Sequence, residues 1–321
     1  MWATIEGVQR VMGNKMSKYI ITADWHLRSQ RPRCRLDDNW LETQWNALGQ
    51  IIDYANEYEA DVIVIGDIFH STNETTNEVI GLVQEVALHL ERFGKSLYIL
   101  AGNHDLPQHN LDNINRSAFQ ILLNSKNINH LDQLDIWRSD ECNKMKISAS
   151  NFGAADILNT EIVFKHILCF PENERIPPND KIVKPSELFA QFENAKYIFT
   201  GDYHRQFVYT KGKKKKLINP GCLLRQAADM MDYEPSVTLI SFEDGELEYQ
   251  ILQIPDDERM VTDEYLEKEE MRNSRIEAFI ERIKENEQVT FDFIENVHNL
   301  IKSNNINPEI KNTILELMEQ T

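Results

Sequence analysis

Aspartate, histidine and asparagine residues recur in short groups at the ends of apolar runs, or within them. In chain order they are Asp24, His26, Asp67, His70, Asn103, His104, Asp105, His166, Asp202 and His204. Carboxylate, imidazole and amide ligands without cysteine favour Mn²⁺, Fe or Mg²⁺ over a structural zinc ion. This number of candidate ligands suits two ions, because a carboxylate can bridge two cations about 3.5–4 Å apart. Such a pair of cations activates a water molecule for attack on phosphate.

Each group also has a simpler explanation when it is taken singly. An aspartate after a strand is often a turn or capping residue, and the GNHD stretch at 102–105 could be a plain turn. His166 lies in an apolar run and could be a hydrogen-bonded core residue. The joint occurrence of all the groups, at helix-length spacings, favours one shared site.

The apolar runs themselves predict buried strands at 18–23, 61–66, 96–102, 161–170 and 196–201. Between the first three, apolar residues recur every three to four positions and predict helices over 40–58 and 77–93. This alternation indicates parallel βαβ units. An open α/β sheet binds its ligands at the carboxyl ends of its strands, where most of the polar groups fall.

Beyond about residue 195 the pattern changes. Short strands with turn signals predict antiparallel hairpins, the last one turning at Asp244-Gly245. Pro255 and the two aspartates after it break that pattern. Amphipathic helices are then expected over 263–286, over 290–302 and from Asn307-Pro308 onward.

Composition limits the class of protein. The chain of 321 residues and 37.5 kDa suits one large domain, or a domain with an appendage. No apolar run approaches the roughly 20 residues of a membrane helix, and the N-terminus lacks a signal-peptide pattern. The four cysteines are far apart, which favours reduced thiols and a cytoplasmic location.

The net charge of −18 argues against a broadly basic nucleic-acid-binding surface. Half of this charge lies in residues 251–321, and one local basic run occupies 211–216. The rest of the chain is therefore less acidic than the total charge suggests.

The ordered motifs over roughly residues 17–226 resemble those of the calcineurin-like metallophosphoesterases. ADWHL, GDIFHS and INPGCLLRQ resemble one branch in particular, the SbcD-type DNA repair nucleases. The resemblance implies an α/β (α+β) fold, a β-sandwich flanked by helices, with a small C-terminal helical appendage. We expect an N-terminal extension at 1–15, a nuclease domain at 16–254, and a reduced cap with a partner-binding region at 255–321.

The resemblance also implies a role for each residue. Asp24, His26 and His204 would hold one metal ion. Asn103, His166 and Asp202 would hold the other, with Asp67 as the bridge. His104 would be the catalytic histidine, Asp105 would orient it, and His70 would help to place the scissile phosphate.

One motif departs from the family pattern. The family usually has GHxH where this chain has Gly201, Asp202, Tyr203 and His204. Either Asp202 replaces the histidine as a ligand or the second metal site is weakened, and we favour replacement. A third carboxylate tilts the preference toward Mn²⁺ or Mg²⁺ and away from zinc.

The activity implied by the resemblance is that of an Mn²⁺-dependent DNA nuclease in DNA repair, recombination or replication. It would be a 3′→5′ exonuclease on double strands and an endonuclease on single strands. One alternative is a phosphatase or phosphodiesterase that acts on small molecules or proteins. A second is a scaffold that keeps the fold without catalysis.

Substrate and partner surfaces are expected in three places. Basic residues that could contact DNA, or simply be solvated, are Arg28, Arg31, Lys214 and Arg225. The acidic C-terminal helices, at about 289–319, would either pack on the core or bind an SbcC-type coiled-coil ATPase in a groove. The family also commonly forms homodimers.

Overall fold

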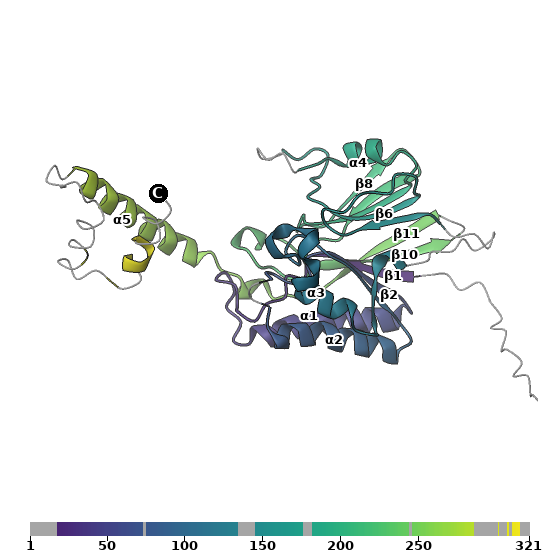
Figure 1. The fold of residues 1–321 in the computed structure, drawn as a ribbon, viewed down its shortest axis with the longest axis horizontal. Coiled ribbons are helices and arrows are strands. Elements are labelled where there is room, and N and C mark those ends of the chain that lie inside the picture. The colour runs from purple at the N-terminus through teal and green to yellow at the C-terminus, as the bar shows by residue number, and fades with distance from the viewer. Residues whose placement is uncertain are drawn as a thin grey trace, which may run out of the picture. The chain divides into compact units, whose positions relative to one another are not determined.

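The structure is a computed structural model that describes residues 18–72, 75–133, 145–175, 182–243, 246–285, 301, 307 and 310–314. Two β-sheets lie face to face, and helices cover the outer face of each (Figure 1). The expected sandwich flanked by helices is therefore confirmed.

The first sheet has six strands in the order β11-β10-β1-β2-β3-β4. Strands β1 to β4 are mutually parallel, and the β10–β11 hairpin joins them through an antiparallel pairing of β10 with β1. The bounds are β1 Lys18–Thr22, β2 Asp61–Ile65, β3 Leu97–Leu100, β4 Ile128–His130, β10 Ser236–Glu243 and β11 Glu246–Gln253.

The second sheet has five strands in the order β5-β6-β7-β9-β8. Its strands are parallel except for the β8–β9 hairpin. The bounds are β5 Ile147–Ser150, β6 Ile162–His166, β7 Tyr197–Gly201, β8 Phe207–Lys211 and β9 Lys215–Asn219.

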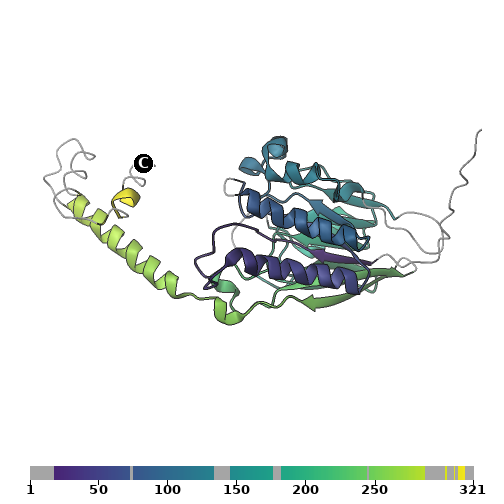
Figure 2. The same cartoon turned by 90° about the horizontal axis from the view of Figure 1, so that it is seen from below.

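Helices α1 (Trp40–Glu57) and α2 (Asn77–Arg92) lie side by side on the outer face of the first sheet (Figure 2). Side-chain oxygens of Asn39 and Thr76 cap the first turns by accepting backbone N–H groups. The short α3 (Ala118–Leu123) follows on the same layer. The sequence predicts α1 and α2 because their buried apolar residues recur at helical spacing.

Alternating residues of the central strands enter different cores. Val62 and Val64 pack against α1 and α2, whereas Ile63 and Ile65 pack against the second sheet. On the far side, α4 (Pro185–Gln191) covers the second sheet with Leu188 and Phe189. The strands read as continuous apolar runs because both faces of each strand are buried.

The first compact unit ends at Val261, beyond the expected boundary at 254–255. Asp256 has a buried carboxylate that pairs with Arg35 and Arg225, and Val261 forms a β-bridge with Arg35. These contacts hold the segment after β11 on the first unit, although its sequence signals a break.

The second unit spans Thr262–Thr321 and contains α5 (Glu264–Glu285), which confirms the helix expected at 263–286. The helix expected at 290–302 and most of the last one lie outside the described residues, as do residues 1–15 and Cys142. The other three cysteines are buried and free. Among the described helices, none is long and apolar enough to cross a membrane.

Candidate metal centre

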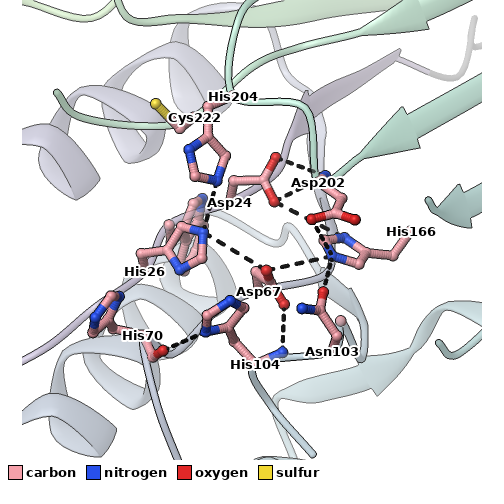
Figure 3. A network of polar contacts seen from close by, with 12 residues as sticks. Asp24, His26, Asp67, His70, Asn103, His104, His166, Asp202, His204 and Cys222 are labelled. Atoms are coloured by element: carbon pink, nitrogen blue, oxygen red, sulfur yellow. Dashed lines mark hydrogen bonds and ion pairs between the residues drawn. The ribbon is translucent and has the colours of Figure 1, made fainter. Parts of the chain in front are cut away.

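The predicted ligands gather at one edge of the two sheets. Asp24 and His26 follow β1, Asp67 follows β2, and Asn103 follows β3. His166 ends β6, and Asp202 with His204 follows β7 in the second sheet. These residues surround one centre in Figure 3. Because these residues lie at or just after the carboxyl ends of neighbouring strands, seven side chains from distant parts of the chain come together.

Four of these residues adopt left-handed backbone conformations. Asp24, His26, Asp67 and Asp202 have φ angles of 50°, 45°, 48° and 79°. Such angles are uncommon outside glycine, and strained residues of this kind cost about 1–3 kcal/mol and cluster at functional sites. Backbone hydrogen bonds hold these turns together: the N–H of Asp24 donates to Gly66 and that of His26 donates to Asp67.

Two glycines permit the close approach of the turns. A Cβ atom at Gly66 would overlap the ring of His166, and one at Gly102 would overlap the side chain and backbone of Asp67. Gly66 also has a φ of 77°. The glycines of the GD and GNHD motifs therefore make room for ligands, and their spacing in the motif follows from this packing.

The first predicted ligand group is assembled. Nε2 of His26 lies 3.0 Å from Nε2 of His204, and single ligand atoms of Asp24, His26 and His204 lie within 4.8 Å of one another. The carboxylate oxygens of Asp24 accept the backbone N–H of Asp202 at 3.0 Å. One cation between these three side chains would complete the group.

The second predicted group surrounds His166. Its Nε2 lies 2.9 Å from Oδ1 of Asn103, 3.4 Å from Oδ2 of Asp67 and 4.0 Å from Oδ1 of Asp202. Its Nδ1 lies 2.9 Å from the carbonyl oxygen of Ile65. That carbonyl fixes the ring with Nε2 toward the other ligands.

Asp67 lies between the two groups. Its Oδ2 is buried without a hydrogen-bond partner in the described part of the chain, 3.6 Å from His26 and 3.4 Å from His166. Its Oδ1 accepts the backbone N–H of His104 at 2.9 Å. A buried, unsatisfied carboxylate oxygen is costly, and a bridging contact to two cations would satisfy it. The residues present therefore fit a two-metal centre.

Burial and charge set the protonation of the ligands. Burial lowers the pKa values of His26 and His204 and raises those of Asp24 and Asp202. Burial alone would lower the pKa of His166, but the carboxylate of Asp67 outweighs it and raises that pKa. In the absence of a cation, protons therefore replace part of the missing positive charge.

His104 and His70 form the rim of the centre. The rings stack with centroids 5.8 Å apart, and the carbonyl oxygen of His70 lies 2.6 Å from Nδ1 of His104. Burial, followed by the charge of Arg28, lowers the pKa of His70 to about 4, so this ring is neutral at neutral pH. His26, His70 and His104 also hold ligand atoms within 4.8 Å of one another.

Asp105 does not orient His104 in the expected way. Its buried carboxylate accepts the backbone N–H groups of Ile68, Phe69 and Gly102. Burial, and then the charge of Asp67, raises the pKa of Asp105 to about 7. Asp105 thus joins the GNHD turn to the turn after β2, and the carbonyl oxygen of His70 is the partner of the His104 ring.

Of the four residues predicted to contact DNA, the structure brings Arg28 to the rim of the centre. Its charge helps to lower the pKa of His70 there. Arg31 is exposed and donates to the carbonyl oxygen of Asp37. Arg225 is buried and donates to the carbonyl oxygen of Asp256. Lys214 lies in the β8–β9 turn, which the parallel register of β9 with β7 places at the opposite end of the sheet from Asp202.

Gln226 ends the INPGCLLRQ motif, but the sequence assigned it no role. Its Nε2 donates to the carbonyl oxygens of Trp25 and His26, within the first ligand turn. The carbonyl oxygen of Arg225 accepts from Arg35, which pairs with Asp37 and Asp256. A buried ion-pair network therefore supports the loop that holds the ligand turn, and its acidic partners, Asp37 and Asp256, lie outside the INPGCLLRQ motif.

A family model and a curated relative match the chain. The model, described as calcineurin-like phosphoesterase, matches residues 17–206. Exonuclease subunit 1 of Enterobacteria phage T4 is 28% identical over 127 residues, which are 39% of this chain and 36% of that protein. The chain thus matches little more than a third of the length of this relative.

Solved structures resemble the chain at low identity. The protein TT1561 of Thermus thermophilus is 12% identical with a TM-score of 0.43, over 74% of this chain and 99% of that one. A dimetal phosphatase from Danio rerio is 11% identical with a TM-score of 0.43, over 75% of this chain and 99% of that one. The family assignment therefore rests on the match over residues 17–206.

Proposed function

Because the chain belongs to the calcineurin-like phosphoesterase family, and is a metal-dependent phosphoesterase, we propose that it is a DNA nuclease. It cuts double strands as a 3′→5′ exonuclease and single strands as an endonuclease, with Mn²⁺ or Mg²⁺, in DNA repair, recombination or replication. The name of the phage relative, an exonuclease subunit, supports the choice of nucleic acid as substrate.

The pairing of His70 with His104 carries this proposal. The motif GDIFHS has a histidine where phosphatases of the family more often have aspartate. This histidine stacks on His104, and its backbone binds Nδ1 of that ring. A neutral imidazole at the rim can hydrogen-bond a phosphodiester, whereas a carboxylate there would repel it.

The residues of the centre divide the chemistry between them. Two divalent cations held by the seven ligands would supply an activated water and neutralise charge on the phosphoryl oxygens. His104 donates its Nδ1 proton to the carbonyl oxygen of His70, which fixes the ring and leaves Nε2 for the substrate. When protonated, His104 gives the Nε2 proton to the oxygen that leaves the phosphorus atom.

The proposal includes a partner. The phage relative is named as a subunit, which supports a role within a complex. We assign the contact with an SbcC-type coiled-coil ATPase to the C-terminal helices at 289–319. We also propose that the chain forms a homodimer and acts in the cytoplasm. Deletion of 289–321 should abolish co-purification with the ATPase while nuclease activity persists, and retained binding would refute the assignment.

A nuclease assay tests the activity. Mn²⁺-dependent cleavage of linear duplex, hairpin and single-stranded DNA is compared with hydrolysis of bis(p-nitrophenyl) phosphate. His104→Ala should lower DNA cleavage by about 10²–10⁴-fold, the usual contribution of a general acid. His89→Ala, on α2, is the matched control and should cut as the wild type does. Hydrolysis of the small diester without any DNA cleavage would favour the small-molecule phosphodiesterase instead.

A further inference from the structure

A cavity of about 460 Å³ lies beside the metal centre and shares His104 with it. Its lining residues are Ser71, Thr72, His104, Leu106, Pro107, Gln108, His109, Asn113 and Arg116. Among the residues that the structure describes, the lining contains one arginine and two histidines, together with hydroxyl and amide groups, and no carboxylate. This composition suits an anion.

A lining without a carboxylate among its described residues is unusual for this protein, whose net charge is −18. Three other cavities, of about 340–430 Å³, each carry at least one carboxylate. One of them lies on the other side of the centre, beside Asp202 and His204, and includes Glu174 and Asp229. A phosphate would be repelled there and accepted in the cavity beside His104.

The loop that forms the cavity is fixed to a metal ligand. Nδ1 of His109 lies 2.8 Å from the carbonyl oxygen of Asn103, and the N–H of His109 donates to Leu106. Gln108 and His109 have φ angles of 57° and 52°, two consecutive left-handed residues. Strain of this kind persists where the surroundings fix the conformation, so the loop is a pre-formed wall.

Two cationic or donor groups of this wall are available to a ligand. The ring of His109 lies 5.8 Å from that of His104, centroid to centroid. Arg116, at the end of the 3₁₀ helix Leu111–Arg116, is exposed and makes no ion pair with the residues that the structure describes. An arginine that pairs with no described carboxylate, beside a phosphoesterase centre, can bind a phosphate through two parallel N–H groups.

We propose that this cavity binds a second phosphate of the substrate, the one next to the scissile phosphate on the strand being cut. Arg116 binds this phosphate and His109 is the second donor. The inference rests on the proposed nuclease function, because a substrate with one phosphate has nothing to place there. It makes the enzyme selective for a polynucleotide over a small diester.

Kinetics with Arg116→Ala test the inference. The value of kcat/KM on an oligothymidylate should fall by about 10- to 100-fold, the worth of a hydrogen bond to a charged group. The loss on bis(p-nitrophenyl) phosphate should be at least tenfold smaller. Arg116→Lys should recover part of the loss. Arg92→Ala, an exposed arginine at the far end of α2, makes the same charge change and should leave both activities intact.

A chemical change in the substrate gives a second measurement. A neutral methylphosphonate linkage next to the cut site should cost the wild type the same factor as Arg116→Ala. The variant should lose nothing more on that substrate, because the two changes remove one contact.

The outcomes separate the two proposals. Equal losses on both substrates, or an oligonucleotide activity that Arg116→Ala leaves unchanged, would overturn the second phosphate site alone. If the wild type hydrolyses only the small diester, the nuclease proposal fails and the second site fails with it.

Discussion

The Nε2 atoms of His26 and His204 lie 3.0 Å apart, although 178 positions separate the residues in the chain. Burial lowers both pKa values, so two neutral rings present nitrogen atoms to one another. Two imidazole nitrogen atoms this close together would hold one cation between them. The similar stretches TADWH and GDYH thus supply an aspartate and a histidine from each sheet to one centre.

Asp67→Asn should disrupt both metal sites at once if Asp67 is the bridge that we propose, because the bridging side chain loses its charge. We expect two bound Mn²⁺ ions per wild-type chain and at most one in the variant. Apparent affinity should fall by more than the 10–100-fold that loss of an outer-shell partner costs. Metal content after dialysis measures this, with Asp53→Asn, on the exposed face of α1, as the control. Full loading of Asp67→Asn would contradict the bridging role.

Mutations can separate the backbone contact of Asp202 from its proposed role as a metal ligand. Its backbone N–H binds Asp24, and its Oδ1 lies 4.0 Å from Nε2 of His166. Asp202→Ala keeps the first contact and should lose the second ion, with DNA cleavage reduced by about 10²-fold or more. Asp202→His restores the family pattern and should recover loading. Equal loading of Asp202→Ala and the wild type would show that Asp202 is not a ligand.

The sequence alone predicted most of the side chains that the structure brings together here, for a physical reason. Ligands such as Asp24 and Asp67 follow buried strands, and the apolar pattern that marks the strands also marks where they end. The order of β10 and β11 in the first sheet could not be read this way, because an antiparallel hairpin can pair with either edge. The short strands β4 and β5 were missed because they contain few apolar residues.

Two site assignments needed three-dimensional information. The partner of His104 is a backbone carbonyl, which every residue carries and no side-chain motif can signal. The distance of Lys214 from the centre depends on the parallel pairing of β9 with β7, although Lys214 is close to His204 in the chain. Sequence proximity is a poor guide here because the five-residue strand β8 lies between the two residues.

Metal binding should release protons and become stronger as pH rises. Without metal, burial raises the pKa of Asp24, and the Asp67 carboxylate overcomes burial to raise that of His166. A ligand must lose its proton to bind a cation, so protons compete with the metal. Calorimetry of Mn²⁺ binding in buffers of different ionisation enthalpy measures this release. Affinity that is constant between pH 6 and pH 8 would contradict it.

Above about pH 6.5 the metal-free protein should lose stability as pH rises, because the lowered pKa values of His26, His70 and His204 add stability only up to their ordinary value of 6.5. The pKa of Asp105 is raised from 3.8 to about 7, so its contribution is fully present below pH 3.8 and is lost through about pH 7. Asp24 acts in the same direction. Bound cations reverse the trend by favouring the ionised carboxylates. The increase in Tm on adding Mn²⁺ should therefore be larger at pH 8 than at pH 6, and the opposite order would refute this linkage.

The buried carboxylate of Asp256 should stabilise both the fold and the metal centre. It pairs with Arg35 and Arg225 at 2.9 and 3.3 Å, and both guanidinium groups are buried. Asp256→Asn leaves these cations without that charge, and breaking a buried ion pair costs about 3–5 kcal/mol. Urea unfolding measures the loss. Asp257→Asn, one residue along and exposed, makes the same change and should leave the urea midpoint unaltered.

The same variant tests the support of the ligand turn. Gln226 contacts the carbonyl oxygens of Trp25 and His26, and its neighbour Arg225 is held by Asp256. If the network positions this turn, Asp256→Asn should weaken Mn²⁺ binding by about 10–100-fold at a temperature where the protein stays folded. Asp257→Asn again provides the reference. Reduced stability with unaltered Mn²⁺ affinity would show that the network serves the fold alone, and that Gln226 keeps the turn in place without it.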